Sequence, residues 1–489
     1  RPYSYKSQVV QTRPYSYKSQ VVQTRPYPPV QFTTLQFPIY GIITHILSNS
    51  EHGMRFTKVC MLGLGYIGLP TACTLATHGV RVTGVDTNPQ VLEALRNGAL
   101  HIHEAGLPEL MAQALASGNL SVSPVPEAAD AFIIAVPTPF LDGQQGEYDG
   151  KPFHKADMTA VAAASEAILP WLRPGNLVIL ESTSPPRTTL DLVAPILERS
   201  GLRAGLDFHL AYSPERVLPG QILRELVENA RVIGGVNPAS AEAGRELYAT
   251  FVRGDIFLTD ATTAEMVKLM ENTYRDINIA IANEFARLAE RFGVDVWEAI
   301  GFANRHPRVK ILNPGPGVGG HCISVDPWFF VEKAPDLARL IHTARLVNDG
   351  QPQHTAELVA GALGGNLKGM RIAALGLAFK PDVDDLRESP AIEVAQRLAQ
   401  GGAQVRAYEP YKPGAAVEGI ETVPSLAAAL EGAAAILLLV SHAEFTALDP
   451  LTVAGLTPAR VVIDTRGAWD AQAWRAAGFS VLRLGDGSA

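Results

Sequence analysis

Short apolar runs, each followed by a glycine-rich or polar segment, recur along the first half of the chain. Residues 58–62 (KVCML) predict a buried strand, and a helical pattern follows it to about Thr77. Further strands are predicted at 81–85, 131–136, 177–180 and 208–211. Strands that alternate with helices are typical of a parallel sheet covered on both faces, so we expect a doubly wound α/β domain over residues 54–255.

The same alternation returns near the C-terminus. Strands are predicted at 371–375, 405–408, 435–440 and 460–463. They indicate a second Rossmann-like, doubly wound domain over residues 346–489, without the glycine pattern of the first.

A helical pattern joins the two halves, in a predicted central domain of residues 256–345. It starts after Asp260, where Thr262 and Glu265 match a capping box, and it continues to Phe292, before Gly293. A second helix is expected to extend to about Asn304. The first helix is longer than most globular helices, which suggests a structural spine or a dimer seam.

The first 53 residues have a different pattern. RPYSYKSQVVQT occupies residues 1–12 and repeats unchanged at 13–24. We interpret Met54 as the native start and residues 1–53 as translated upstream DNA, with disorder expected. The alternative is a basic interaction arm.

Composition narrows the function classes. The chain has 489 residues, is 47% hydrophobic and 18% charged, and has a formal net charge of −8, which argues against a nucleic-acid surface. No apolar run is long enough to predict a membrane span. Three cysteines make no disulfide framework, so we expect a reducing, cytoplasmic setting. No metal site is predicted.

A glycine fingerprint follows the first predicted strand. Gly63, Gly65 and Gly68, with Tyr66 and Ile67 between them, open the helix, and Asp86 follows the next strand 18 residues after Gly68. In this setting G-x-G-x-x-G indicates a dinucleotide site, with the pyrophosphate at the helix N-terminus. Asp86 would bind ribose hydroxyls and repel a 2′-phosphate, which predicts NAD rather than NADP. The alternative is an α/β domain without nucleotide.

Polar residues end the later strands of this half. Because ligands bind at the carboxyl ends of parallel strands, we expect the loops with Pro137 and Thr138, with Thr183, and with Glu215 and Arg216 to lie near the nicotinamide. Ordinary turn chemistry is the alternative for any one of them.

Residues 314–330 (PGPGVGGHCISVDPWFF) are the densest candidate site. Cys322 follows four glycines and precedes Asp326 by four positions, which suggests a covalent nucleophile; the alternative is a buried structural cysteine. We expect a lowered thiol pKa, near positive groups and backbone donors.

Basic residues surround this loop in the sequence. Lys268, Asn272 and Arg275 share one face of the long helix, where the alternative is a solvated surface. Arg305, His306 and Arg308 precede the loop and suit an anionic substrate. In the C-terminal half, Lys380, Arg387 and Arg466 follow predicted strands and suit phosphate or nucleotide; a packing domain is the alternative.

Eight motifs together resemble the UDP-glucose/GDP-mannose dehydrogenase family over nearly all of residues 55–485. They are GLGYIGLP (63–70), VPTP (136–139), STSP (182–185), SPERVLPG (213–220), the helix with Lys268 and Asn272, GPGVGGHC (315–322), GLAFKPDVDDLRESP (376–390) and DTRG (464–467).

The resemblance implies a reaction and roles for residues. The family oxidises a sugar C6 alcohol to a carboxylate with two NAD molecules, through a thiohemiacetal and thioester on Cys322. It implies that Lys268 and Asn272 face the oxyanion, that Glu215 and Asp326 handle water and protons, and that Thr183 positions water and cofactor. Arg387 would approach the cofactor. The residues implied to face a UDP-sugar are Arg216, Val217, Lys268, Asn272, Arg275, Arg305, His306, Arg308, Gly317, Gly319, Lys380 and Arg466.

Departures from the glucose-oxidising pattern point to a subgroup. His321 and Val325 stand where glucose- and mannose-oxidising relatives tend to carry serine and lysine. The resemblance therefore implies a 2-acetamido sugar, most simply UDP-N-acetyl-D-mannosamine, with UDP-N-acetylglucosamine or UDP-glucose as alternatives. It also implies a homodimer or higher oligomer. A catalytically silent NAD-binding regulator and a two-electron dehydrogenase are the remaining alternatives.

Overall fold

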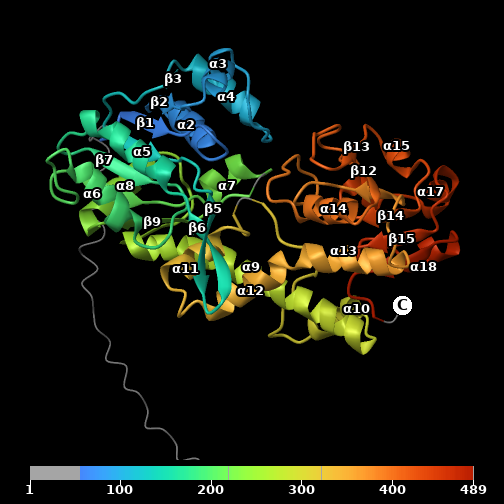
Figure 1. Cartoon of the computed structure of the whole chain (residues 1–489). Coiled ribbons are helices and arrows are strands. Elements are labelled where there is room, and N and C mark those ends of the chain that lie inside the picture. Colours follow the sequence, from blue (N-terminus) through green and yellow to red (C-terminus); the bar gives the residue numbers. More distant parts are fainter. Residues whose placement is uncertain (1–54, 219, 321, 488–489) are drawn as a thin grey trace, which may run out of the picture. The chain divides into compact units, whose positions relative to one another are not determined.

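The computed structural model describes residues 55–218, 220–320 and 322–487 (Figure 1). The interpretations placed on residues 1–53 and on His321 lie outside these described residues.

An eight-stranded sheet forms the N-terminal half, in the order β10-β9-β8-β7-β4-β1-β2-β3. All neighbouring strands are parallel except β8 and β9. The strands are β1 (Lys58–Leu62), β2 (Arg81–Val85), β3 (Leu120–Ser123), β4 (Ala131–Ile134), β7 (Leu177–Leu180), β8 (His209–Tyr212), β9 (Arg231–Gly235) and β10 (Ile256–Asp260).

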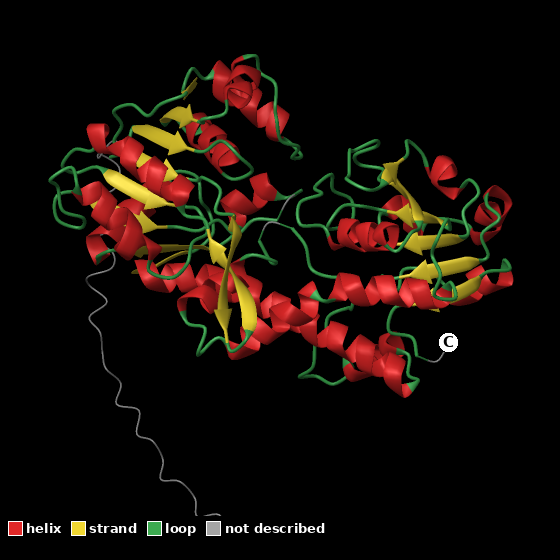
Figure 2. Cartoon of the chain, in the orientation of Figure 1, coloured by secondary structure: helices red, strands yellow, loops and turns green. Residues whose placement is uncertain are grey.

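Helices cover both faces of this sheet (Figure 2). Val59 and Met61 of β1 belong to one hydrophobic core, and Cys60 and Leu62 to the other, so alternate residues of one strand are buried on opposite faces. The helices are α2 (Gly68–Thr77), α3 (Pro89–Arg96), α4 (Leu107–Ala116), α5 (Thr159–Ile168), α6 (Ala194–Glu198), α7 (Ile222–Glu228) and α8 (Pro238–Tyr248). The predicted doubly wound fold is confirmed.

One hairpin was not predicted. It joins β5 (Phe140–Tyr148) to β6 (Lys151–Ala156) and packs on α11 (Asp326–Lys333), where Phe153 and Trp328 share a small core. The turn residues Asp149 and Gly150 have φ values of 52° and 70°. Asp-Gly between two strands is a strong hairpin signal, so the sequence did contain it.

The long central helix, α9 (Ala261–Phe292), has 32 residues and ends at Gly293 in a left-handed conformation, as predicted. The predicted capping box is wrong, because the Asp260 carboxylate caps the helix by accepting from the Thr263 N–H at 2.9 Å. Glu265 is instead buried and accepts from the Thr189 N–H at 2.8 Å. The helix α9 is followed in this region by α10 (Val296–Ala303), by α11 and by α12 (Arg339–Asp349).

The C-terminal sheet has six parallel strands in the order β13-β12-β11-β14-β15-β16. Its strands and helices are β11 (Arg371–Leu375), β12 (Gln404–Tyr408), β13 (Glu421–Thr422), β14 (Ala435–Leu438), β15 (Val461–Asp464), β16 (Ser480–Arg483), α13 (Gln351–Ala362), α14 (Pro390–Gln400), α15 (Leu426–Leu430), α16 (Ala443–Thr446), α17 (Pro450–Leu456) and α18 (Ala471–Ala476). Two cores, one on each face, again confirm the predicted winding. Within the described ranges, no helix is long and apolar enough to cross a membrane.

Candidate active site

The glycine-rich turn after β1 packs closely against the end of β4. A Cβ on Gly63 would lie 2.5 Å from the Ala135 carbonyl oxygen, and one on Gly68 would lie 1.9 Å from the Gly63 oxygen. A Cβ on Gly65, by contrast, would have no atom within 4 Å. Ile67 caps α2 without a side-chain hydrogen bond. The backbone N–H groups at the N-terminus of α2 are therefore available to bind the pyrophosphate of a dinucleotide.

Asp86 follows β2 and contacts the same turn. Its Oδ2 accepts from the Leu64 N–H at 3.1 Å, and its Oδ1 accepts from the Asn88 N–H at 2.9 Å. A carboxylate can accept further bonds, such as those of ribose hydroxyls. The turn and the acid together fit an NAD molecule.

A serine ties two of the strand-end loops together. Ser182, after β7, donates its hydroxyl to the Val136 carbonyl oxygen, after β4, at 2.7 Å. The neighbouring candidates differ in exposure: Pro137 is exposed, Thr183 is half-buried and Thr138 is buried.

Four candidate catalytic residues come together at the junction of α9 and α11. Lys268 and Asn272 are one turn apart on α9, and the Asn272 Nδ2 donates to the Asp326 Oδ2 at 2.6 Å. Asp326 is the first residue of α11, and its N–H donates to the Cys322 carbonyl oxygen at 2.8 Å. Lys268 interacts electrostatically with both the Cys322 thiol and the Asp326 carboxylate.

Burial controls the ionisation of this group. Burial raises the pKa of Asp326 to about 6, against the opposing effects of Lys268 and the Asn272 hydrogen bond. Cys322 has solvent-exposed surface. Even so, the protein that surrounds its thiol raises the pKa of this group, and the Asp326 carboxylate raises it further. The predicted lowering is wrong, because Lys268 and Arg387 only partly offset the desolvation.

The glycines before Cys322 pack against the C-terminal half of the chain. A Cβ on Gly319 would lie 2.2 Å from the Glu388 carbonyl oxygen, and one on Gly317 would lie 2.7 Å from the Pro390 side chain. One on Gly320 would lie 2.7 Å from the Phe379 ring. These close contacts leave little room for a side chain at the three positions, and the substrate role implied for Gly317 and Gly319 stays a prediction.

A buried polar chain fixes the start of the same loop. The Gly315 N–H donates to Asn283 Oδ1 at 2.9 Å, and Asn283 Nδ2 donates to Asn348 Oδ1 at 2.9 Å. Asn348 in turn donates to Asp276 at 2.8 Å, and Arg345 pairs with Asp276 at 2.5 Å. The sequence did not predict this network, which links α9 and α12 to the cysteine loop.

Arg387 approaches the dinucleotide turn from the C-terminal half. Its guanidinium lies 5.2 Å from the centre of the Tyr66 ring and pairs with Asp385 at 2.6 Å. The Arg387 carbonyl oxygen accepts from the Gly320 N–H at 3.3 Å. The structure thus places Arg387 over Tyr66, both of them predicted cofactor residues. It also places Arg387 next to the cysteine loop.

Three more predicted cations lie near this junction. The Arg466 Nη1 is 2.5 Å from the place of a Cβ on Gly315, and burial lowers the pKa of Arg466. Burial and the neighbouring Arg275 lower the pKa of Lys380. The charge of Arg275 therefore acts on Lys380, although the two residues are far apart in sequence.

Glu215 belongs to a buried ion-pair network. Its carboxylate pairs with Arg231, which also contacts Glu181 at 3.4 Å and stacks over the Tyr248 ring at 4.0 Å. Burial raises the pKa of Glu181 to about 7, while Arg231 opposes the rise. Glu181, Arg231 and Tyr248 were not among the predicted site residues, although they surround Glu215.

The residues after Glu215 also contact other parts of the N-terminal half and the long helix α9. Arg216 pairs with Glu271 of α9 at 2.6 Å, and Val217 packs against the N-terminal core. Two backbone N–H groups of this loop, those of Gly220 and Ile222, donate to the buried Glu104 at 2.8 and 2.9 Å.

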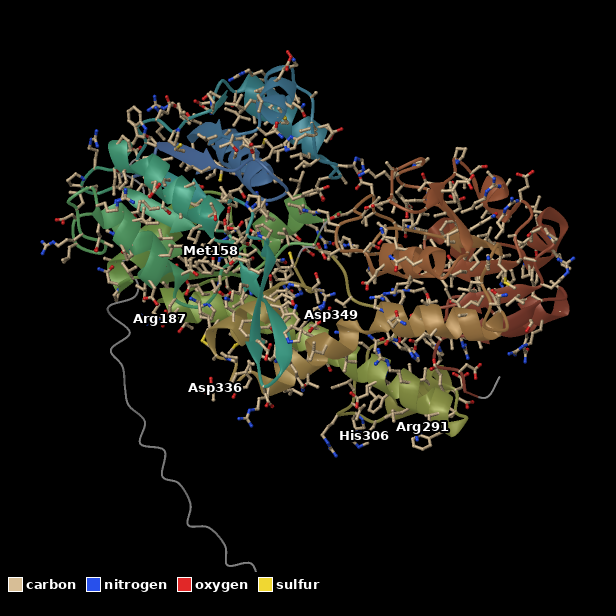
Figure 3. All side chains as sticks on the ribbon, viewed as in Figure 1. Met158, Arg187, Arg291, His306, Asp336 and Asp349 are labelled. Carbon is tan, nitrogen blue, oxygen red and sulfur yellow. The ribbon has the colours of Figure 1, made fainter. Side chains whose placement is uncertain are left out.

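Arg305, His306 and Arg308 are placed differently from the other candidates. All three are exposed in the loop that follows α10, where Figure 3 labels His306. They are not among the described residues that interact with Cys322.

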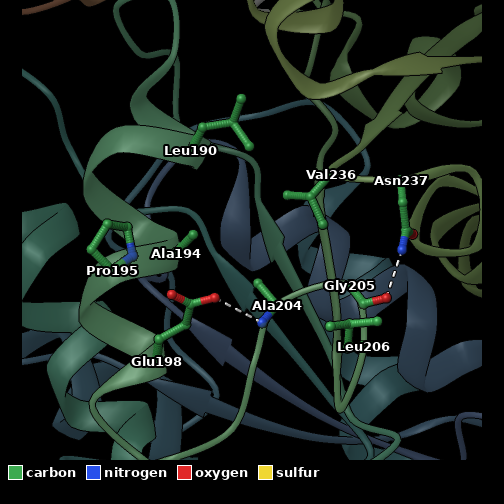
Figure 4. Close-up of a pocket in the computed structure, with 9 residues that line it drawn as sticks. All are labelled: Leu190, Ala194, Pro195, Glu198, Ala204, Gly205, Leu206, Val236 and Asn237. Atoms are coloured by element: carbon green, nitrogen blue, oxygen red, sulfur yellow. Dashed lines mark hydrogen bonds between the residues drawn. The ribbon is translucent and has the colours of Figure 1, made fainter.

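A separate pocket of about 360 Å³ lies between α6 and the loops around Gly205 and Asn237 (Figure 4). Asn237 Nδ2 donates to the Gly205 carbonyl oxygen at 2.6 Å, and Glu198 accepts from the Ala204 N–H at 3.1 Å. None of the candidate site residues lines this pocket. Within the described residues, no cluster of three or more His, Cys, Asp or Glu could hold a metal ion.

Three domain models of one family match successive parts of the chain. The NAD binding domain matches residues 57–252, the central domain 262–350 and the UDP binding domain 373–471. The chain belongs to the UDP-glucose/GDP-mannose dehydrogenase family. It is therefore an NAD-dependent oxidoreductase, and the predicted family, enzyme class and cofactor are confirmed. The domain boundaries and site residues stay predictions.

Curated relatives of this dehydrogenase cover most of its length. The UDP-N-acetyl-D-mannosamine dehydrogenase of Methanocaldococcus jannaschii is 47% identical over 433 residues, which cover 88% of this chain and 97% of the relative. An NDP-N-acetyl-D-galactosaminuronic acid dehydrogenase of Ralstonia nicotianae is 48% identical over 430 residues, with 85% and 97% covered. A solved UDP-D-ManNAc dehydrogenase structure from Pyrococcus horikoshii superimposes with a TM-score of 0.80 at 40% identity, covering 88% of this chain and all of that one.

Proposed function

We propose that this dehydrogenase oxidises the C6 alcohol of UDP-N-acetyl-D-mannosamine to the carboxylate, through a thioester on Cys322. The observation that carries the proposal is the grouping of Cys322, Lys268, Asn272 and Asp326 near Arg387, whose guanidinium lies over the Tyr66 ring. Relatives named for this substrate, at 40–47% identity, support the choice of sugar.

The reaction needs a nucleophile that holds the aldehyde between two oxidations. NAD, held at the glycine turn and Asp86, would supply the hydride acceptor for each oxidation of C6. After the first, the Cys322 sulfur attacks the aldehyde carbon and forms a thiohemiacetal. After the second, the product is a thioester, which water cleaves to the carboxylate and the free thiol. A dehydrogenase that stopped at the aldehyde would have no use for this thiol.

The neighbours of Cys322 suit the charges that develop. The Lys268 ammonium and the Asn272 amide can donate to the oxyanion on C6, and Asp326 fixes the amide by its hydrogen bond. Because the pKa of Asp326 is raised to about 6, its carboxyl can exchange a proton near neutral pH. Glu215 and Thr183 remain proposed participants in positioning water.

Cations at the junction suit a UDP diphosphate. Arg275, Lys380 and Arg466 supply positive charge from three different elements, and a diphosphate would relieve the repulsion between Arg275 and Lys380. Arginine adds a bidentate fork that matches phosphate oxygens.

The test is a panel of sugars under one set of conditions. UDP-N-acetylmannosamine should give the highest kcat/KM and two NADH per sugar. UDP-glucose, which lacks the acetamide, should be orders of magnitude poorer if a buried polar group reads that substituent. UDP-glucose as the best substrate would reject the acetamido assignment. UDP-N-acetylglucosamine or UDP-N-acetylgalactosamine as the best would reject only the configuration, and one NADH per sugar would reject the thioester.

We further propose that a second copy of the chain covers one face of α9. Six large apolar side chains on this helix are exposed: Met270, Tyr274, Ile281, Phe285, Leu288 and Phe292. At 3.6 residues per turn they fall within a stripe about 60° wide. A stripe of this length on a soluble enzyme is typical of an interface.

A charge placed on the stripe should separate the copies. Phe285→Asp is expected to halve the mass measured by sedimentation equilibrium, because a carboxylate would be buried without a partner. Leu451→Asp on α17 is the matched control, since Leu451 is 72% exposed and lies outside the stripe. An unaltered chain that sediments as a monomer would reject the proposed dimer.

A further inference from the structure

A buried histidine joins two loops of the C-terminal sheet. The Asp382 N–H donates to His442 Nδ1 at 2.9 Å, so the ring proton resides on Nε2. That Nε2 lies 3.1 Å from Glu409 Oε2 and donates to it. His442 is fully buried and Glu409 almost so, and both therefore depend on these partners.

Glu409 holds the first part of the loop that follows β11. Its Oε2 also accepts from the Leu377 N–H at 2.7 Å and the Ala378 N–H at 2.9 Å. Burial acts to raise the pKa of Glu409, but the hydrogen bonds from His442 and Leu377 outweigh it and lower the pKa. The carboxylate is thus ionised and accepts from two successive backbone groups.

Asp382 holds the second part of this loop. Its carboxylate accepts from the Ala443 N–H at 2.9 Å and the Tyr411 hydroxyl at 3.0 Å. Its backbone is left-handed, with φ of 60°, which is uncommon for a residue other than glycine. The hydrogen bonds around Asp382 hold it in this conformation. The loop is therefore fixed at Leu377–Ala378 and at Asp382.

Lys380 lies between the two fixed points. Burial lowers the pKa of Lys380, and the positive charge of Arg275 on α9 lowers it further, while Glu104 and Glu225 oppose the shift. Phe379, its neighbour, packs on Gly320 of the cysteine loop. A free loop would move the lysine away from Arg275, whereas a fixed loop keeps both cations in place before a ligand binds.

We propose that His442, acting with Glu409, is a positioning residue that fixes the loop carrying Lys380, so that this lysine is held in place for the diphosphate of UDP. This inference rests on the proposed function, because that function places UDP at Lys380. His442 itself touches neither ligand, and its effect passes through the backbone of the 376–382 loop. Tyr411 also joins Glu409 to Asp382, through its N–H at 3.1 Å and its hydroxyl at 3.0 Å, but His442 is the described partner of the Asp382 N–H.

The test compares two substitutions of His442 by calorimetric titration with UDP and by steady-state kinetics. His442→Leu keeps the volume but removes the donor and the acceptor, and should weaken UDP binding by about 10- to 100-fold. KM for NAD should stay within about twofold, since the dinucleotide turn is on another domain. His442→Gln keeps one donor and one acceptor and should restore most of the UDP affinity.

Two further variants separate positioning from general stability. Thr355→Val removes a buried hydrogen bond within α13, from the Thr355 hydroxyl to the Gln351 carbonyl oxygen at 2.9 Å, and should leave UDP affinity unchanged. If His442→Leu does not fold, Tyr411→Phe, which loses one bond to Asp382 at the surface, should still weaken UDP binding by roughly twofold to fivefold.

The outcomes are distinct. Unchanged UDP affinity in His442→Leu, or in Tyr411→Phe where the former does not fold, would overturn the inference but leave the proposed function intact. An equal loss in Thr355→Val would also overturn it, because the effect would then be general. Failure of the unaltered enzyme to bind UDP would overturn the proposed function, and this inference with it.

Discussion

Replacement of Cys322 by alanine should abolish formation of the carboxylate while NAD affinity stays nearly unchanged. The thiol is the only group proposed to hold the aldehyde covalently, so without it the second oxidation loses its thiohemiacetal substrate. Cys322 keeps solvent-exposed surface, as attack on a bound sugar requires. The measurement is product analysis after complete turnover, together with NAD titration by fluorescence.

Cys73→Ala is the matched control for this variant. Cys73 is buried in the N-terminal core, and burial raises the pKa of its thiol to about 12, so it is inert as a nucleophile. Its loss should cost some stability and leave the two-step oxidation intact. Full conversion to the carboxylate by Cys322→Ala would contradict the thioester route.

The central strands of both sheets could be predicted from sequence because they are buried on two faces, whereas β3, β9, β10, β13 and β16 were not predicted. Residues 59–62 and 435–438 are short, continuously apolar runs, which are typical of a buried strand. The glycine turn and Asp86 could also be predicted from the sequence. The spacing between them follows from the geometry of one strand, one helix and the next strand.

The capping box was wrongly predicted because tertiary contacts decide which partners these side chains find. Thr262 and Glu265 have capping-box spacing, but Asp260 caps α9 and Glu265 is buried against Thr189. The sequence also could not show that Gly317 and Gly319 pack against Pro390 and Glu388, because these residues are distant along the chain.

The direction of the pKa shift of Cys322 could not be predicted from the sequence either. The sequence shows that basic residues accompany Cys322, and on that basis a lowered pKa was expected. It does not show how much protein surrounds the thiol, or that Asp326 lies beside it; both raise the pKa. The Glu181–Arg231–Glu215 network was missed for the same reason, because its members come from three separate strand ends.

The second large effect is expected at Lys268. Lys268→Met should lower kcat for the overall oxidation by ~10²–10³-fold, the usual cost of removing one aimed donor from an oxyanion site. The loss should be in kcat rather than in UDP affinity, since Lys268 is proposed to act on the charge that develops at C6. Pre-steady-state NADH formation measures the first oxidation and the overall rate in one experiment.

The same lysine should set the reactivity of the thiol. Lys268 lowers the pKa of Cys322 and Asp326 raises it, so the two substitutions should shift the thiol in opposite directions. The rate of alkylation by iodoacetamide rises with pH as the thiolate forms. Its midpoint should move to higher pH in Lys268→Met and to lower pH in Asp326→Asn. Shifts in the same direction would mean that the variants act on Cys322 through altered packing rather than through charge, and the oxyanion role of Lys268 would then lose its electrostatic support.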